Sequence, residues 1–224
     1  MDWEVARPAC GLSVSWEDGP MRPNPLFASD DPELVRALVR EHPWATLVTS
    51  TGAGLAASHY PVLLEEGDPG LTLLTHLGRP DEEVLEIESG EVLVIVQGNH
   101  GYVSPGWYTP EERIVPTWNF TVAHLHGTPR VLDEAENFEV LTKLVEHFEG
   151  RLDRPTFLDP ADAPIARGTV GLRIPVDRFE IKRKLSQNKG AETRRSIVAA
   201  LREDGPYRNP ALADEMEGEL DENR

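Results

Sequence analysis

Cysteine is nearly absent from the 224-residue sequence, in which Cys10 stands alone. A lone cysteine excludes a disulfide within the chain and fits a reducing compartment, so we expect the protein in the cytoplasm. No apolar run approaches the ~20 residues that span a bilayer, and residues 1–11 lack the apolar stretch of a secretory signal. We therefore expect a soluble protein without membrane contact.

Basic residues are also scarce, because 22 Lys and Arg stand against 39 Asp and Glu, for a net charge of −17. Such an acidic chain opposes extensive binding to nucleic acid. Residues 178–195, however, hold seven basic and two acidic side chains, a local charge of +5 that leaves −22 for the remainder. This basic segment is either a solvated helix or strand edge, or a site for phosphate on a cofactor or on DNA.

Common catalytic fingerprints are missing as well. The sequence has no G-x-G-x-x-G or Walker loop, no nucleophile elbow and no Ser/His/Asp order, so the usual nucleotide folds and hydrolases have no support. His124 and His126 have a metal-ligand spacing, but neither a cysteine nor a paired-carboxylate motif accompanies them. We expect no metal and interpret both as hydrogen-bonded core or interface histidines.

The apolar periodicity predicts mainly β structure with inserted helices, an α+β class. We expect helices at 32–42, 80–89, 133–148 and 191–202, and an ordered aromatic loop at 99–108. Strands linked by short turns indicate an antiparallel meander rather than a parallel sheet. They are expected at 44–50, 55–64, 71–76, 91–97, 117–132 (one strand, or two broken at Gly127 and Pro129) and 169–184, the last bent at Pro175.

These elements group into one domain with two tails. We expect a flexible N-terminal arm at 1–25, the domain at 26–202 and an acidic disordered tail at 203–224. The tail assignment rests on its many carboxylates and on the absence of a clear apolar period.

Three segments carry residues suited to binding. Thr75, His76 and Arg79 lie where a strand enters a helix, which suits a phosphate or is an ordinary turn. The aromatic segment 97–108, with His100 and Tyr102, is a wall for a flat ring or a self-packed corner. Strand alternation places Trp118 and Asn119 on opposite faces, and places Lys182 and Lys184 together with Arg183 opposite. Ser186, Gln187 and Asn188 then offer donors and acceptors for a ring edge or phosphate.

Several of these stretches together resemble a known family, the PaiB-type proteins described as FMN-binding negative transcriptional regulators. The matching stretches are 42–49, 57–61, 97–108, 115–120 and 184–188, and the resemblance runs from about Pro25 to Leu201. It implies an antiparallel split β-barrel, similar to the pyridoxamine-oxidase-like proteins. It also implies a homodimer with FMN at the subunit interface.

The resemblance further implies roles for individual residues. Thr75, His76 and Arg79 would hold the phosphate, although Pro80 and Asp81 stand where a small residue and Asn are expected. The flavin would be lined by Ser58 and His59, with Trp118 and Asn119 reaching in from the partner subunit and Lys184, Gln187 and Asn188 closing the site.

Function divides into three alternatives. We expect a flavin-dependent oxidoreductase acting on a small molecule, with His59, His100 and Tyr102 as candidate catalytic residues and the redox chemistry supplied by FMN. The second alternative is a negative transcriptional regulator that senses or uses FMN, for which residues 178–195 are the candidate DNA contact. The third is a haem-binding or haem-degrading split barrel, since the chain has seven histidines.

Overall fold

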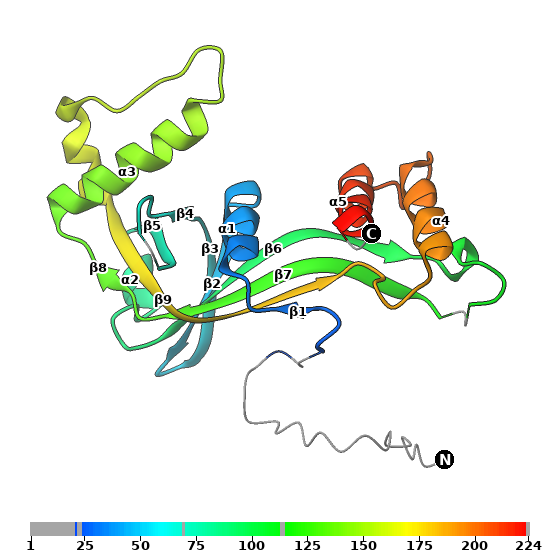
Figure 1. Ribbon diagram of the computed structural model, residues 1–224. Helices are drawn as coiled ribbons and strands as arrows, with labels where there is room; N and C mark the ends of the chain where they lie inside the picture. The colour runs from blue at the N-terminus through cyan, green and yellow to red at the C-terminus, as the bar shows by residue number, and fades with distance from the viewer. Residues whose placement is uncertain (1–20, 22–23, 69, 113–114, 223–224) are drawn as a thin grey trace.

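The computed structural model describes residues 21, 24–68, 70–112 and 115–222 (Figure 1). The expected flexible arm at 1–25 lies almost entirely outside the described residues. The strands are β1 Ala28–Ser29, β2 Trp44–Thr51, β3 Gly54–Pro61, β4 Leu63–Leu64, β5 Thr72–Gly78, β6 Val92–Val103, β7 Thr117–Gly127, β8 Arg130–Val131 and β9 Thr169–Lys184. The helices are α1 Pro32–Glu41, α2 Asp81–Val84, α3 Glu134–Glu149, α4 Ala191–Arg202 and α5 Pro210–Glu222, with 3-10 segments η1 Pro105–Trp107 and η2 Pro160–Gly168.

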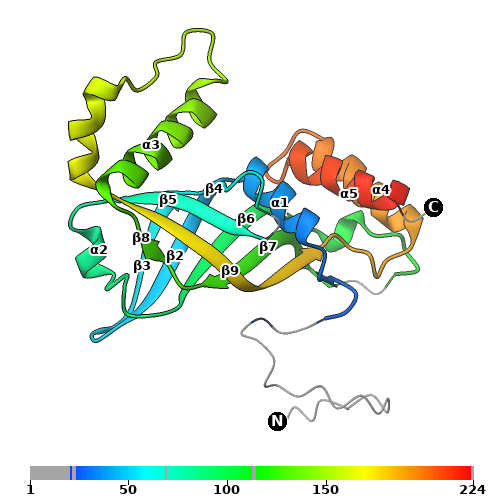
Figure 2. The ribbon, with the colours of Figure 1, turned by 60° about the vertical axis from the view of Figure 1, so that its left-hand side comes forward.

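The strands form one antiparallel sheet in the order β3-β2-β6-β7-β9-β5-β4. Residues 169–175 of β9 pair with β5, and residues 176–184 pair with β7, so this one strand belongs to both halves of the sheet. Because β3 also lies against β5, the sheet curls on itself into a barrel (Figure 2). The expected mainly β, antiparallel class is confirmed, and β9 changes its pairing partner from β5 to β7 between Pro175, where a bend is expected, and Val176.

The bend requires a glycine on the neighbouring strand. A Cβ atom on Gly127, the last residue of β7, would lie 2.0 Å from the Pro175 carbonyl oxygen. Any side chain there would collide with backbone, so glycine lets β7 end against β9 where β9 turns from one half of the sheet to the other.

Local signals explain where the helices begin. Asp31 caps α1 by accepting a hydrogen bond from the Glu33 amide at 2.9 Å, and Pro32 occupies the first helical position. Asp133 and Glu136 form a capping box at the start of α3. The helices expected near 32–42, 133–148 and 191–202 are confirmed.

The core has three parts, each covered by a different element. The main cluster fills the barrel, with Leu73, Leu77, Val96 and Leu172 among its fully buried side chains. A second cluster lies between α3 and the outer side of β5. The third joins α4 and α5 to the far end of β6 and β9, beyond the barrel. Figure 1 shows β6, β7 and β9 extending there beneath these two helices.

Several expected boundaries differ from the structure. The helix expected at 80–89 is reduced to four residues, Asp81–Val84. The loop expected at 99–108 is instead β6 as far as Val103, because residues 100–103 pair with β7 after an irregularity between Gln97 and His100. Residues 117–132 are two strands, as the break at Gly127 and Pro129 predicts. The strand expected at 55–64 is divided into β3 and β4.

The acidic disordered tail expected at 203–224 is wrong for its described residues, because Pro210–Glu222 forms helix α5. Leu212, Ala213 and Met216 are completely buried against α4 and the sheet. These apolar residues recur one helical turn apart between carboxylates, so the helix has a narrow apolar stripe that the charge count obscures. Among the described residues, no helix has the length and apolar character that crossing a bilayer requires.

The docking of α5 generates a stability prediction. Met216→Ala should lower the free energy of unfolding by about 2–5 kcal/mol, as expected for a buried large-to-small change. Leu152→Ala is the matched control, because Leu152 is 55% exposed, lies outside the sheet and should change stability by less than about 0.5 kcal/mol. Urea denaturation of the three proteins checks this. Equal midpoints for Met216→Ala and wild type would contradict a docked α5.

Candidate functional site

On the outward side of β3, β2, β6, β7 and β9, the described part of the chain places no helix over the sheet. Cross-strand pairing places His59, Thr46, Ile95, His124 and Glu180 in one row across these strands. Their neighbours on the inward face, such as Leu47 and Val94, are buried in the barrel. We call the outward surface the open face; it also carries Trp44, Gln97, His100, Tyr102, Trp118, Phe120, Val122, Lys182 and Lys184.

Large aromatic side chains are exposed at both ends of the open face. Trp44 is 63% exposed and Trp118 is 54% exposed. Trp44 stacks on His59, with ring centroids 6.5 Å apart and planes inclined by 14°. The exposed rings of Trp44 and Trp118 are candidate contacts for a flat ligand.

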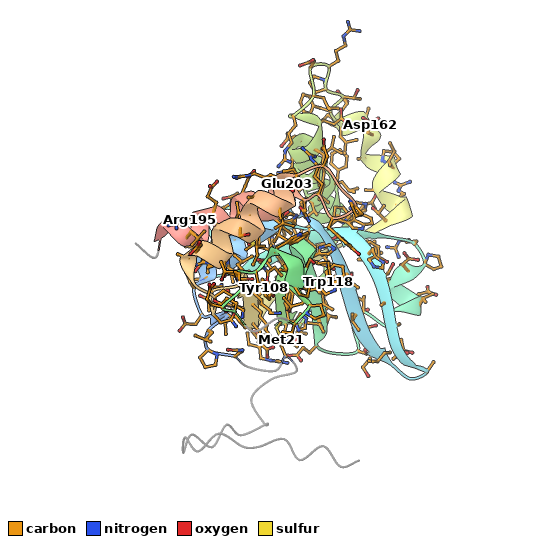
Figure 3. The ribbon with its side chains drawn as sticks, turned by 90° about the vertical axis from the view of Figure 1, so that its right-hand side faces the viewer. Met21, Tyr108, Trp118, Asp162, Arg195 and Glu203 are labelled. Atoms are coloured by element: carbon orange, nitrogen blue, oxygen red, sulfur yellow. The ribbon has the colours of Figure 1, made fainter. Side chains whose placement is uncertain are left out.

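The far end of the open face joins aromatic and polar groups. Tyr102 and Trp118 are cross-strand partners, with ring centroids 6.2 Å apart in an edge-to-face arrangement. His100 Nδ1 lies 3.1 Å from both the Gln97 side-chain nitrogen and the Gly98 carbonyl oxygen. Figure 3 views the molecule from this end, where Trp118 lies below the two C-terminal helices.

Two lysines lie on the same part of the open face. Lys184 Nζ donates to the Trp118 carbonyl oxygen at 2.9 Å and to the Thr117 hydroxyl. Burial first, and the charge of Lys182 second, lower the pKa of Lys184. Lys182 Nζ lies 6.0 Å from the centroid of the Phe120 ring. Among the described residues, no carboxylate lies within ion-pair distance of Lys184, so its amine is available to an anionic group.

The three residues expected to hold a phosphate do not converge. Thr75 is fully buried and its hydroxyl donates to the Pro61 carbonyl oxygen at 2.7 Å. Strand alternation turns His76 to the opposite face of β5, and burial lowers the pKa of His76. Arg79 is paired with Glu82. The following helix is short and begins with Asp81, Glu82 and Glu83, which repel an anion.

Ser58 and His59 also separate, because they are adjacent residues of a strand. His59 is on the open face, whereas Ser58 lies on the inward face beside Tyr60. The Tyr60 hydroxyl donates to Asp81 Oδ2 at 2.8 Å. Burial above all, with Asp81 also contributing, raises the pKa of Tyr60 to about 12, so its hydroxyl stays protonated.

Asn119 and the turn after β9 hold the structure together locally. Asn119 is fully buried beneath α5, and its Nδ2 donates to Ser186 Oγ at 2.9 Å and to Met216 Sδ at 3.3 Å. Ser186 has φ 63°, a left-handed conformation that the bond to Asn119 stabilises. Gln187 accepts from the Leu185 amide at 2.8 Å and donates to the Arg183 carbonyl oxygen at 2.7 Å. Asn188 is exposed.

The basic segment 178–195 does not form one surface. Arg178 pairs with Glu91, Lys189 lies 2.9 Å from Glu112, and Arg194 is buried on α4. Arg183 lies 3.3 Å from Glu219 and 3.7 Å from Glu215, both on α5. The basic side chains of this segment therefore point in several directions, where Arg178, Lys189 and Arg183 meet different carboxylates. Lys182 and Lys184 lie apart from these three, on the open face.

The histidine pair on β7 shares a face as expected. His126 is buried, with Nδ1 at 2.8 Å from Arg178, and burial lowers the pKa of His124. In the part of the chain that the structure describes, no three His, Cys, Asp or Glu side chains are grouped so as to hold a metal ion.

Of the predicted residues, the open face thus brings together His59, His100, Tyr102, Trp118 and Lys184. Sequence reasoning missed Trp44 as a site residue, although it stands at the start of a strand, directly after His42 and Pro43. It also missed Tyr207, which lies 4.8 Å from Tyr102 between ring centroids. Tyr207 falls in the segment that was expected to be disordered.

Comparison with known structures defines the class of fold. The chain superposes on the FAD- and haem-binding protein of Mycobacterium smegmatis with a TM-score of 0.56 and 19% identity, over 81% of this chain and 82% of that one. It superposes on the flavocytochrome Anf3 of Azotobacter vinelandii with a TM-score of 0.54 and 18% identity, over 84% of this chain and 75% of that one. The fold is therefore a split barrel of the flavin-binding type.

The family of the chain is a narrower class than its fold, and a family model identifies it. Residues 21–178 match the family model described as "Putative FMN-binding domain", and the chain belongs to this family. Its FMN-binding assignment confirms the expected cofactor. The chain is also 29% identical to "Protease synthase and sporulation protein PAI 2" of Bacillus subtilis over 199 residues, 87% of this chain and 95% of that protein. The expected resemblance to PaiB-type proteins is confirmed.

The residues of the open face fit FMN. Trp44, Trp118 and Tyr102 offer surfaces for a flat ring, and Lys184 and His59 offer donors for a phosphate or a ring edge. These groups lie on exposed sheet rather than in an enclosed pocket, so a ligand bound there would be open to solvent on one side.

Proposed function

We propose that the protein is a flavin-dependent oxidoreductase acting on a small molecule, and that it works as a homodimer with FMN held between two open faces. The observation that carries the proposal is the open face itself, where exposed Trp44 and Trp118 lie on one sheet with Lys184, whose amine has no carboxylate within ion-pair distance among the described residues. An exposed surface of this kind suits an aromatic, anionic ligand covered by a second subunit.

The positions of the candidate residues support the proposed dimer. His59 shares a cross-strand row with Ile95, and His100 is five positions further along β6, or about 15 Å at the usual rise of a strand. Across a two-fold axis, the end of one open face that carries Trp118 and Lys184 meets the end of the other that carries Trp44 and His59. Each FMN site would then take Trp118 and Lys184 from one subunit and Trp44 and His59 from its partner. In this arrangement the second subunit would cover the side of FMN that a single open face leaves exposed.

Each group on the open face then has a definite task. Bound FMN supplies the hydride or single-electron transfer. Lys184 neutralises anionic charge, and Trp44 and Trp118 exclude water from the ring. His59, His100 and Tyr102 are the candidate proton donors and acceptors beside the substrate. Lys184 and His59 replace Thr75 and Arg79 as the phosphate anchors, because the latter two are engaged elsewhere.

The activity is tested with purified protein reconstituted with FMN. We expect flavin absorption bands and steady oxidation of NADPH or NADH when a small electron acceptor such as a quinone is present. A bound flavin that no nicotinamide reduces would refute the oxidoreductase. A Soret band in place of the flavin bands would favour the haem alternative, and a salt-sensitive gel shift with DNA would favour the regulator.

The anchor is tested by exchanging single charges. Lys184→Met should raise the Kd for FMN about tenfold or more, because a hydrogen bond to a charged group contributes about 1.5–3 kcal/mol. Lys184→Arg should restore most of the affinity. Arg79→Met is the matched control and should change the Kd less than about threefold, since Arg79 is paired with Glu82. Quenching of FMN fluorescence measures all four. If Arg79→Met weakened FMN binding more than Lys184→Met did, the phosphate would instead lie near Arg79, just before α2.

The dimer is tested at an exposed residue of the open face. Trp44→Glu should convert the dimer to a monomer and weaken FMN binding, because it places a charge on the apolar interface. Phe157→Glu, at a side chain of similar exposure outside the open face, should leave the mass unchanged. Sedimentation equilibrium gives the masses. A wild-type protein that remains monomeric with FMN bound would exclude this arrangement.

A further inference from the structure

The hairpin of α4 and α5 is fixed to the far end of the sheet by polar contacts as well as apolar ones. Asn209, just before α5, donates to the His100 carbonyl oxygen at 2.9 Å. Glu215 accepts from the Thr121 hydroxyl at 2.5 Å and from Asn99 Nδ2 at 3.0 Å. The connection between the two helices is therefore held in one place beside β6. Both helices lie beyond residues 21–178, the part that matches the FMN-binding family.

This connection brings Tyr207 to the open face. The Tyr207 ring lies 4.8 Å from Tyr102 and 6.5 Å from Trp107, between centroids, and Tyr102 in turn lies 6.2 Å from Trp118. We call Tyr207, Tyr102 and Trp118 the aromatic wall. Tyr207 is 51% exposed and Trp118 is 54% exposed, so two of its rings still have accessible surface.

The pairing of β6 leaves room for this contact. The ladder between β2 and β6 ends at Val96, so residues 97–103 of β6 pair with β7 alone among the described strands. Gly101 has no side chain on the helix-facing side, where a Cβ would lie 2.9 Å from Leu212. The hairpin can therefore approach the strand closely enough for Tyr207 to reach Tyr102.

A cation adjoins the aromatic wall. Lys184 Nζ is bonded to the Trp118 carbonyl oxygen at 2.9 Å. A second cation, Lys182, lies over Phe120, the cross-strand partner of Lys184. Among the described residues, Lys184 has no carboxylate within ion-pair distance, and rings that offer their surfaces beside such an amine suit a ligand that is both planar and negatively charged.

We infer that Tyr207 is a specificity-determining residue, and that the aromatic wall receives a planar aromatic substrate bearing a carboxylate or similar anionic group. The ring of the substrate packs against Tyr207 and Trp118, and its anionic group lies near Lys184, whose positive charge then acts on both the substrate and the FMN phosphate. The inference rests on the proposed function, because the wall lies on the same open face as the flavin. It assigns the C-terminal hairpin to the substrate side of the site.

The test uses the holoprotein and 2-naphthoate as the probe, with binding followed by tryptophan fluorescence and by perturbation of the flavin absorption bands. Tyr207→Ala should raise the Kd for 2-naphthoate about three- to tenfold, the range expected for losing one aromatic contact. Tyr207→Phe should stay within about twofold of wild type, since the ring is kept. Phe157→Ala, at a side chain that is also 51% exposed, should have no effect.

Two further ligands define the substrate class. Cyclohexanecarboxylate keeps the charge without the flat ring, and 2-naphthamide keeps the ring without the charge; both should bind more weakly than 2-naphthoate. Equal binding of all three, or an unchanged Kd in Tyr207→Ala, would overturn the inference. So would a failure of 2-naphthoate to bind wild type.

The FMN affinity separates this result from the proposed function. Tyr207→Ala should leave the Kd for FMN and the circular dichroism spectrum unchanged. If the wild-type protein binds FMN and oxidises NADPH but does not bind 2-naphthoate, the substrate assignment alone is overturned. If the protein binds FMN but oxidises no nicotinamide, the proposed oxidoreductase activity is refuted. Binding of 2-naphthoate to the aromatic wall can still be measured by tryptophan fluorescence in that case.

Discussion

One strand, β9, is shared by both halves of the sheet, and the open face depends on that sharing. Its first half closes the barrel against β5, and its second half pairs with β7 beyond the barrel. The change of partner occurs at Pro175 and Val176, where Gly127 permits the backbones to meet. Because β9 continues past the barrel, β6 and β7 continue with it, and the sheet gains a platform with helices on one side only.

The platform that β6, β7 and β9 form beyond the barrel also separates the basic side chains of residues 178–195. A positive count along 178–195 suggests a single patch, but strand alternation and the turn after Lys184 distribute these side chains among several neighbours. Arg183 points to the carboxylates of α5, whereas Lys182 and Lys184 point to the open face. The acidic surplus of the chain thus neutralises the cations that face helices and loops. On the open face, the amines of Lys182 and Lys184 lie beside aromatic rings over a small area, which suits a small anion better than a nucleic-acid backbone.

The sequence predicts the features that depend on the spacing of residue types within one strand or helix. It does not predict the features that depend on contacts between elements far apart in the chain. Alternation correctly placed Lys182 and Lys184 opposite Arg183, and proline and glycine marked the bend and break of the late strands. The aromatic segment before Val103 was read as a loop because its glycines hide a strand, yet those glycines serve the approach of α5. Helix α5 was missed because burying Leu212 and Met216 against the sheet outweighs its many carboxylates. Alternation predicts that Asn119 and Trp118 lie on opposite faces, but it does not predict which of them is exposed. That depends on α5, which buries Asn119.

The contact of Asn209 with β6 has a consequence for the protein in a crowded solution. Beyond Val96, β6 is an outer strand with two glycines and unprotected backbone groups, the kind of border on which a strand of another molecule can add. Asn209 occupies the His100 carbonyl oxygen, and Glu215 of the helix behind it binds Asn99 on the same border. Removal of the C-terminal helix would therefore expose this border to edge-to-edge strand addition.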